Sequence, residues 1–298
     1  MAQAQTSAAG MGAHDEAGKG AQARARGPLV TFSLQVLMLV AVLVAMIPGI
    51  FMIMTSLKTN TQYGIDKLGL PAPITSENFQ TVLTQHPFPV WMLNSALLSG
   101  GAVLVTSAVS VLAAYAIARM NFVGRELLLG ISTSMMAVPP VVMVVPLFVL
   151  FAQIDLVGTL HGVILIYAGL LTPFSVFLLV TFFRTIPTEL IESALIDGAS
   201  PLGVLIRIIL PLSGAPLVTL FVVNLLYVWN DLLIALLFLP DEKLRTLMVG
   251  ISVFQGRYLQ DIPLSMAGMT LASLPMILIY IVFQRYFIRG LVAGAVKG

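Results

Sequence analysis

The sequence has no cysteine and few charged residues. Asp, Glu, Lys and Arg together make up 9% of the 298 residues, whereas an ordinary soluble domain carries about 25%. Without cysteine the chain can form no disulfide and offers no thiolate for catalysis or metal binding. A folded domain in water also needs a wettable surface, which so few charges cannot supply. The surroundings of most of this chain are therefore expected to be lipid.

Histidine is scarce, and a nucleotide-binding loop is missing. The three histidines lie far apart, without the spacing of metal ligands, at His14, His86 and His161. The segment from Gly12 to Gly20 resembles a phosphate-binding loop, but its glycines are one residue too far apart. Gly20 also stands where a Ser or Thr would ligate magnesium. No metal or cofactor site is predicted in this chain, so any ATP must be handled elsewhere.

What the sequence has in abundance is apolar residues, at 58% of the chain with a mean hydropathy of +1.00. A membrane-spanning helix needs roughly 20 such residues, and its backbone must satisfy its own hydrogen bonds in hydrocarbon. The predicted fold class is an all-α integral membrane protein, with residues 1–28 a disordered tail and residues 29–298 a transmembrane domain. Six spans are expected, at about 30–54, 95–118, 127–151, 162–183, 208–238 and 264–284.

The positive residues suggest an orientation in the membrane. With the N-terminus in the cytoplasm, ten Lys and Arg lie inside: Lys19, Arg24, Arg26, Arg119, Arg125, Arg184, Arg207, Arg285, Arg289 and Lys297. Five lie outside: Lys58, Lys67, Lys243, Arg245 and Arg257. Positive residues favour the cytoplasmic side, so both termini are predicted to be cytoplasmic in a multi-pass protein of the cell membrane. Because these charges lie in short loops, a lipid bilayer rather than nucleic acid is the expected partner.

One cytoplasmic segment, residues 185–207, interrupts the apolar runs. Pro187 suits a first helical turn, and Gly198 suits the end of that helix. Ser200 and Pro201 are typical of the N-cap and first residue of a second helix. On the first helix Leu190, Ile191, Ala194 and Leu195 are expected to share an apolar face. The pattern predicts a helix–glycine–helix elbow, either a membrane-surface loop or a docking site for another protein.

The fifth predicted span contains a group of polar residues. Asn224, Tyr227 and Asp231 are spaced to lie along one stripe of a helix, with Asn230 beside it, and Trp229 adds an aromatic face. Such residues could contact a hydroxyl-rich substrate, or they could bond neighbouring helices together. A proton relay is disfavoured because no second buried carboxylate or histidine accompanies Asp231.

Proline and glycine mark two further spans. Val138-Pro139-Pro140 and Pro146 should break the third span, where a packed bend is favoured over a hinge or the lining of a cavity. Gly100-Gly101 in the second span is interpreted first as a helix packing site.

The elbow resembles the coupling motif of ATP-binding-cassette importer permeases. The matching residues are Glu192-Ser193-Ala194, then Gly198, then Ile208-Ile209-Leu210-Pro211, with serine at one position where the motif has alanine. Other segments resemble the maltose-type carbohydrate-uptake branch: Thr55–Lys58, Asn94-Ser95, Tyr115–Arg119, Trp229–Asp231 and Phe283–Gly298. Asp231 stands where that branch has glutamate.

This resemblance implies a fold, partners and roles for individual residues. The fold would be that of a type I importer permease. The partners would be a second, related permease, cytoplasmic ATP-binding subunits and an external sugar-binding protein. The residues implied in coupling to the ATPase are Glu192, Ser193, Ala194, Asp197, Gly198, Ala199, Ser200, Pro201, Ile208, Leu210 and Pro211. The chain would conduct sugar by alternating access and perform no chemistry. The alternatives are a secondary transporter driven by an ion gradient, a membrane-embedded enzyme and a membrane scaffold subunit.

Overall fold

The computed structural model describes residues 28–254 and 261–295, and every regular element in those ranges is a helix. The predicted all-α class is therefore confirmed. The chain divides into a first unit of residues 1–51 and a second of residues 52–298. Helix α2 runs through the end of the first unit into the second, and the other helices belong to the second unit. Their bounds are α2 Pro28–Ser56, α3 Asn60–Ile65, α4 Glu77–Gln85, α5 Phe88–Arg119, α6 Arg125–Met135, α7 Pro140–Gln153, α8 Leu160–Phe183, α9 Thr188–Ile196, α10 Pro201–Val204, η1 Leu205–Ile209, α11 Leu210–Leu212, α12 Gly214–Asn230, α13 Leu233–Phe238, η2 Glu242–Leu244, α14 Leu247–Ser252 and α15 Ile262–Ala295.

Four of the described helices are long and apolar enough to cross a membrane as single helices, namely those that contain Phe32–Ser56, Phe88–Arg119, Leu160–Phe183 and Ile262–Arg285. Two more segments meet the same test only as bent pairs. α6 and α7 are bent by 102°, and the segment Pro201–Leu212 is bent by 81° from α12. The described residues therefore contain four spans, or up to six if each bent pair counts as one.

The expected spans 127–151 and 208–238 are not continuous helices. In the first, Pro139 has an extended backbone (φ −62°, ψ 130°) and Pro140 begins a new helix, because a residue that precedes proline is pushed out of the helical region. In the second, the chain bends at Ser213 and leaves the helix again at Asp231. The prolines predicted the break at Pro139, whereas the bend at Ser213 and the end of α12 at Asp231 were not predicted.

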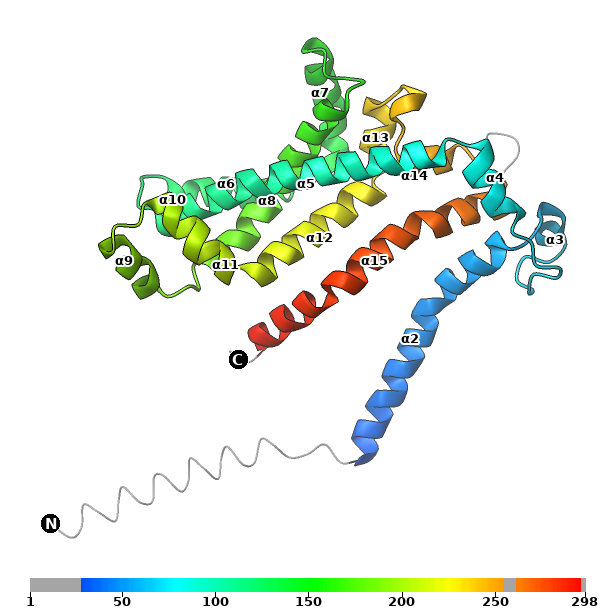
Figure 1. Ribbon diagram of the computed structural model, residues 1–298, viewed down its shortest axis with the longest axis horizontal. Coiled ribbons are helices and arrows are strands. Elements are labelled where there is room, and N and C mark those ends of the chain that lie inside the picture. The colour runs from blue at the N-terminus through cyan, green and yellow to red at the C-terminus, as the bar shows by residue number, and fades with distance from the viewer. Residues whose placement is uncertain (1–27, 255–260, 296–298) are drawn as a thin grey trace, which may run out of the picture. The chain divides into compact units, whose positions relative to one another are not determined.

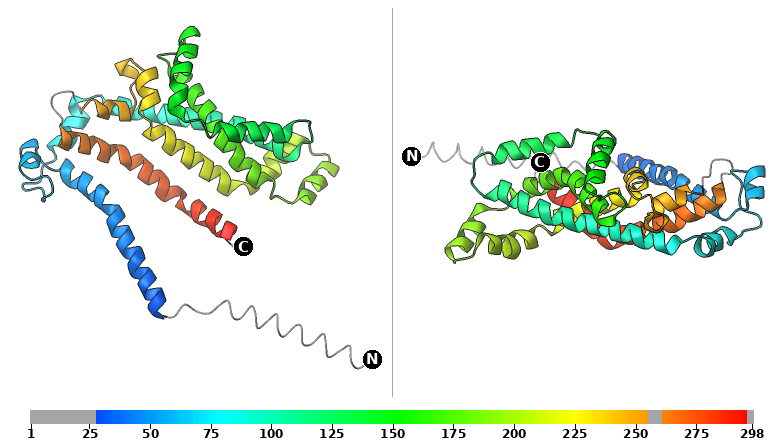
Figure 2. Two further views of the ribbon diagram at one scale, coloured as in Figure 1. Left: turned by 180° about the vertical axis from the view of Figure 1, so that it is seen from behind. Right: turned by 90° about the horizontal axis from the view of Figure 1, so that it is seen from above.

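Within the second unit, α5 and α8 pack along each other over most of their length, and α12 contacts α5, α8 and α15 (Figures 1 and 2). α9 and α10 lie at the C-terminal end of α5, whereas α4 and α14 lie at its N-terminal end (Figure 1). With 32 residues, α5 is about 48 Å long. It therefore connects the elbow segment to the opposite end of the unit.

The adjacent glycines of α5 provide a matched pair for testing helix packing. A Cβ atom at Gly101 would lie 2.6 Å from Cδ1 of Ile164 on α8, whereas nothing lies within 4 Å of one at Gly100. Gly101→Ala should lower the stability of the purified chain by up to about 1 kcal/mol, because the end of the Ile164 side chain must move aside for the added methyl group. Gly100→Ala should be neutral or stabilising by up to about 1 kcal/mol. Thermal unfolding in detergent measures both, and equal midpoints for the two variants would contradict the packing assignment.

Hydrogen bonds from the side chains of Lys58 and Asn78 hold the segment that follows α2. Lys58 is buried, and its Nζ donates to the backbone carbonyls of Asp66 at 3.0 Å and Lys67 at 3.1 Å. The amide of Asn78 donates to the carbonyls of Ser56 and Lys58, both at 2.8 Å. Lys58 therefore has a structural role that the resemblance of the Thr55–Lys58 segment alone did not indicate.

The carboxylate of Asp66 closes the turn that follows α3. The backbone N–H groups of Gly69 and Leu68 donate to its Oδ1 at 2.8 and 3.1 Å. These bonds favour the ionised form and hold the pKa of Asp66 below its usual value. The stabilising effect is thus present above the ordinary pKa of the carboxyl and is lost as the pH falls through the lowered one.

The loop between α13 and α15 is attached to the start of α5. The amide of Asn94 donates to the carbonyls of Lys243 at 2.8 Å and Arg245 at 3.0 Å. The Oγ of Ser95 accepts from the backbone N–H of Leu247 at 2.8 Å. Asn94 and Ser95 are buried, so these bonds take the place of the hydrogen bonds to water that their side chains would otherwise make. The Asn94-Ser95 pair therefore holds η2 and α14 against α5.

Candidate functional site

The elbow has the local geometry that the sequence predicts. α9 ends before Gly198, which has a left-handed backbone with φ +83°. The side chain of Ser200 accepts from the backbone N–H of Gly203 at 3.1 Å, and Pro201 is the first residue of α10. The predicted helix end, N-cap and helix start are confirmed. One detail differs: Pro187 is the N-cap of α9 and lies just before the first turn.

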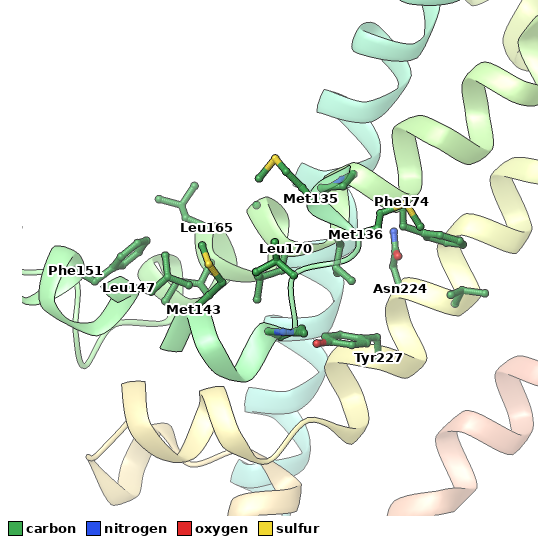
Figure 3. A pocket seen from close by; sticks show the side chains of 17 residues that line it. Met135, Met136, Met143, Leu147, Phe151, Leu165, Leu170, Phe174, Asn224 and Tyr227 are labelled. Atoms are coloured by element: carbon green, nitrogen blue, oxygen red, sulfur yellow. The ribbon is translucent and has the colours of Figure 1, made fainter. Parts of the chain in front are cut away.

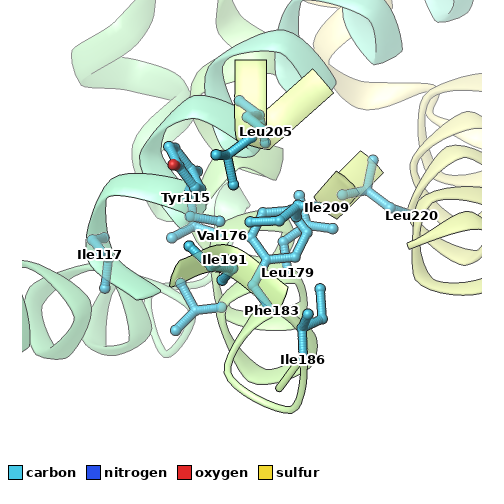
Figure 4. Packing of buried hydrophobic residues seen from close by; sticks show 13 residues of the cluster. Tyr115, Ile117, Val176, Leu179, Phe183, Ile186, Ile191, Leu205, Ile209 and Leu220 are labelled. Atoms are coloured by element: carbon cyan, nitrogen blue, oxygen red, sulfur yellow. The ribbon is translucent and has the colours of Figure 1, made fainter. Parts of the chain in front are cut away.

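The apolar face predicted for α9 is only partly buried. Ile191 is buried, in a cluster with residues of α5 and α8, and Ala194 packs against the edge of that cluster (Figure 4). Leu190 and Leu195 are 46% and 45% exposed, and Ile196 at the end of the helix is 86% exposed. This nine-residue helix touches the unit through little more than Ile191, so the predicted apolar face is buried only in part. The remaining apolar side chains stay at the surface.

The residues implied in coupling divide into an exposed set and a packed set. The exposed set is Glu192, Ser193, Asp197, Gly198, Ser200, Pro201 and Pro211. Ala194, Ala199, Ile208 and Leu210 are partly buried and pack against the cluster that holds Ile191. The elbow thus presents carboxylates and exposed apolar groups outward while its small and branched residues fix it to the unit.

A π-helical turn, η1, joins the elbow to α11 and α12. The backbone N–H of Leu210 bonds to the carbonyl of Leu205, five residues earlier. Pro211 follows and has no N–H to donate. The buried Oγ of Ser213 donates to the carbonyl of Ile209 at 2.6 Å. The Ile208–Pro211 part of the motif therefore lies at the end of this π-helical turn and directly after it, just before the chain bends toward α12 at Ser213.

A groove of about 480 Å³ opens between the α6–α7 break, α8 and α12 (Figure 3). Most of its lining is apolar, with Met135, Met136 and Met143 around the break and Phe174 from α8. Val138 and Pro140 line it as well. The break in the third predicted span is therefore the wall of a cavity, and the expectation of a merely packed bend was wrong.

Asn224 and Tyr227 of α12 supply polar side chains to this groove (Figure 3). Asn224 is fully buried, and its Nδ2 donates to Oγ of Ser175 at 2.9 Å, whereas its Oδ1 has no hydrogen-bond partner. Tyr227 is 38% exposed. A buried amide oxygen without a partner is unusual, which makes this end of the groove the best-equipped place for a polar ligand.

Asp231, by contrast, has a structural role. Its Oδ1 accepts from the hydroxyl of Tyr167 at 2.7 Å and from the backbone N–H of Ile234 at 2.9 Å. Tyr167 is fully buried on α8. Asp231 therefore caps the start of α13 and ties it to α8, at the position where α12 ends.

Trp229 and Asn230 lie on another side of α12 from Asn224, because five or six residues advance a helix by about 140° or 240°. The Nε1 of Trp229 donates to the carbonyl of Ala272 on α15 at 3.2 Å. Nδ2 of Asn230 donates to the carbonyl of Leu226 at 2.8 Å. Both line a second groove, of about 460 Å³, between α12 and α15. The five predicted pathway residues therefore do not share one surface.

Sequence reasoning missed the partners of these polar residues, Tyr167 and Ser175. Both lie within the long apolar run of α8, where a hydroxyl group needs a hydrogen-bond partner. The presence of hydroxyl groups in an apolar run indicated that each bonds to a partner, but it does not say which helix supplies that partner. The methionines at the α6–α7 break gave no signal beyond ordinary packing.

Known proteins of similar sequence identify the family of this chain. Residues 106–292 match the family described as binding-protein-dependent transport system inner membrane component. The chain belongs to this family. It is 39% identical over 257 residues to a putative ABC transporter permease protein, ORF2, of Caldicellulosiruptor sp. (strain Rt8B.4), covering 86% of this chain and 93% of the relative.

Two further matches agree with this assignment. The chain is 34% identical over 264 residues to the trehalose/maltose transport system permease protein MalG of Thermococcus litoralis, covering 86% of this chain and 93% of the relative. A chain in the crystal structure of a bacterial ABC transporter involved in the import of the acidic polysaccharide alginate has the same fold. Its TM-score is 0.76 at 21% identity, over 88% of this chain and 98% of that one.

Family membership establishes three of the predictions. The protein is a multi-pass component of the inner membrane. It is a transport subunit of the ATP-binding-cassette class and not an enzyme. As a member of a binding-protein-dependent system, it works with a substrate-binding protein and an ATPase. The elbow and the groove can now be considered as parts of a permease.

Proposed function

We propose that this chain is one of two permease subunits of an ATP-driven importer of disaccharides or short oligosaccharides. The observation that carries the proposal is the cluster of Figure 4, which joins the elbow to helices that line the groove. It contains Ile191 of α9, Phe183 of α8 and Leu220 of α12. Because packed interiors transmit displacement, movement of the elbow would move α8 and α12.

The groove supports a neutral, hydroxyl-rich substrate. None of the residues that line it in the described part of the chain is charged, whereas a phosphorylated substrate would favour Arg or Lys. Asn224 and Tyr227 offer hydrogen-bonding groups, and Phe174 offers an aromatic face. Two polar side chains cannot enclose a sugar, so this subunit forms one wall of the pathway and a second permease the other. The trehalose and maltose of the archaeal relative's name support the same class of substrate.

The orientation follows from charge. Six spans, with each bent pair counted as one, place both termini on the same side, and the ten-to-five distribution of Lys and Arg favours the cytoplasm. The elbow then faces the cytoplasm, where an ATPase subunit docks on its exposed residues. The loop that holds Lys58 and the loop that Asn94 binds, which contains Lys243 and Arg245, face the external binding protein.

The transport cycle is alternating access. ATP binding closes the ATPase subunits, and the elbow transmits this closure to α8 and α12, so that the groove opens outward to receive sugar from the binding protein. ATP hydrolysis then returns the inward-facing state. This chain contributes no catalytic residue to the cycle, and the ATPase subunits bind the ATP and magnesium.

The test is purification of the tagged chain in mild detergent, followed by identification of the proteins recovered with it. A cytoplasmic ATPase and a second permease should co-purify, and the reconstituted complex should take up maltose, trehalose or raffinose only with ATP. A chain recovered alone would contradict the proposal and favour a secondary transporter driven by an ion gradient. An ATPase recovered without any ATP-dependent uptake would favour a membrane scaffold.

The two asparagines of α12 offer a matched test of the pathway. Asn224→Ala should reduce uptake about five- to tenfold, because one hydrogen bond to the substrate is worth about 1 kcal/mol. Asn230→Ala should stay within about twofold of wild type, since Asn230 lies outside the first groove. Uptake is measured at equal amounts of assembled complex. Equal loss in both variants would place the pathway elsewhere.

A further inference from the structure

The last residue of α5, Arg119, extends to the junction between α8 and α9. One terminal nitrogen, Nη2, donates to the backbone carbonyls of Phe183 and Ile186. The other, Nη1, lies 3.5 Å from Oγ1 of Thr188, the first residue of α9. One guanidinium group thus contacts the end of α8, the connecting link and the start of α9.

The positions of these acceptors explain how the contact with Arg119 helps to set the direction of α9. The last carbonyls of a helix have no partner within it and carry partial negative charge, so a cation there stabilises the helix end. In the link of residues 184–187 only Ile186 is buried, and α9 itself buries only Ile191. The direction of α9 relative to α5 therefore depends on Arg119 and on a small apolar contact.

The neighbouring arginines make different contacts. Arg125, the first residue of α6, donates to the carbonyl of Met120 and to Oδ1 of Asn121 in the preceding loop and lies 3.5 Å from the carboxylate of Glu126. Arg184 pairs with Glu126 at 2.6 Å, and both side chains are exposed. Exposed ion pairs contribute little to stability. Among these three arginines, Arg119 is the one whose side chain holds backbone on both sides of the junction.

We propose that Arg119 is a positioning residue that clamps the elbow to α5, so that the ATPase-coupling elbow and the groove-lining helices move as one body. The proposal rests on the coupling role proposed for the elbow. A guanidinium suits this task because its planar fork presents several donors in fixed directions. Lysine in its place keeps the charge but concentrates its donors on one atom.

The absence of native cysteine permits a direct test. Leu112→Cys on α5 and Ile196→Cys at the end of α9, both exposed positions, would carry spin labels in the full chain in lipid nanodiscs. Double electron–electron resonance should give one narrow distance distribution. With Arg119→Gln the distribution should broaden at least twofold, with Arg119→Lys it should broaden less, and with Arg125→Gln it should stay unchanged. An unchanged distribution in Arg119→Gln overturns the clamp, whatever proteins co-purify.

A second readout separates positioning from a general loss of structure. In the reconstituted complex, Arg119→Gln should keep its ATPase subunits but lose at least fivefold in sugar taken up per ATP hydrolysed. Arg119→Lys should recover at least half of that ratio. A wild-type chain without an ATPase would refute the proposed function, while the spin-label distances would still decide on the clamp. A normal ratio in Arg119→Gln would refute the coupling role of Arg119.

Discussion

Replacing Gly198 by aspartate is expected to reduce ATP-dependent uptake at least 100-fold while the chain still inserts into the membrane. Gly198 has φ +83°, where a residue with a Cβ costs about 1–2 kcal/mol. Nothing in this chain lies within 4 Å of a Cβ added there, so the new carboxylate would project from the exposed elbow. At a docked interface it would have to be desolvated beside the carboxylate of Asp197. The ATPase should be lost on purification.

A second glycine provides the control for backbone strain. Gly124, between α5 and α6, also has a left-handed backbone, with φ +92°, and nothing lies within 4 Å of a Cβ added there. Gly124→Asp should carry similar strain and charge yet keep the ATPase and most of the uptake. Gly198→Asn should fall between wild type and Gly198→Asp, because asparagine tolerates this conformation better. Normal uptake in Gly198→Asp would show that the elbow is not the coupling element.

The second large effect is expected at the opposite end of the unit. Gly250→Ala should destabilise the chain by about 2–3 kcal/mol, because the added Cβ would lie 2.2 Å from the ring of Trp91. Trp91 is only 3% exposed, and overfilling a packed site forces side chains and backbone to move. For a protein of this size the unfolding midpoint should fall by about 5–10 °C. Thermal unfolding of the purified chain measures the change.

A double variant decides whether the Trp91 contact is the cause. In Trp91→Leu the large ring is absent, so adding Gly250→Ala to it should cost much less than adding it to wild type. The two changes then fail to add, as expected for residues in contact. If Gly250→Ala costs the same in both backgrounds, or costs nothing in wild type, the close packing of α14 on α5 is not what stabilises this end.

The elbow shows how much of a site can be predicted from sequence. The end of α9 at Gly198 and the N-cap at Ser200 depend on the backbone preferences and side-chain bonds of a few adjacent residues. They appear in the structure as expected. The all-helical fold is predictable for a similar reason, because a backbone in lipid has to bond within its own segment. These features are local, so the composition and the spacing of neighbouring residues are enough to predict them.

The features that could not be predicted from the sequence depend on contacts between residues far apart in the chain. Spacing alone placed Asp231 on a stripe with Asn224, but its carboxylate caps α13 through the N–H of Ile234 and accepts from Tyr167, because α8 passes beside it. The prolines at 139 and 140 indicated a break, but whether the break was filled or lined a groove depended on the packing of α8 and α12 around it. Likewise, nothing near Arg119 in the chain indicates that its side chain reaches the carbonyls of Phe183 and Ile186. Local preferences set where helices start and end, whereas the assignment of each polar side chain to a groove, a cap or a neighbouring helix required the packed arrangement of helices far apart in the chain.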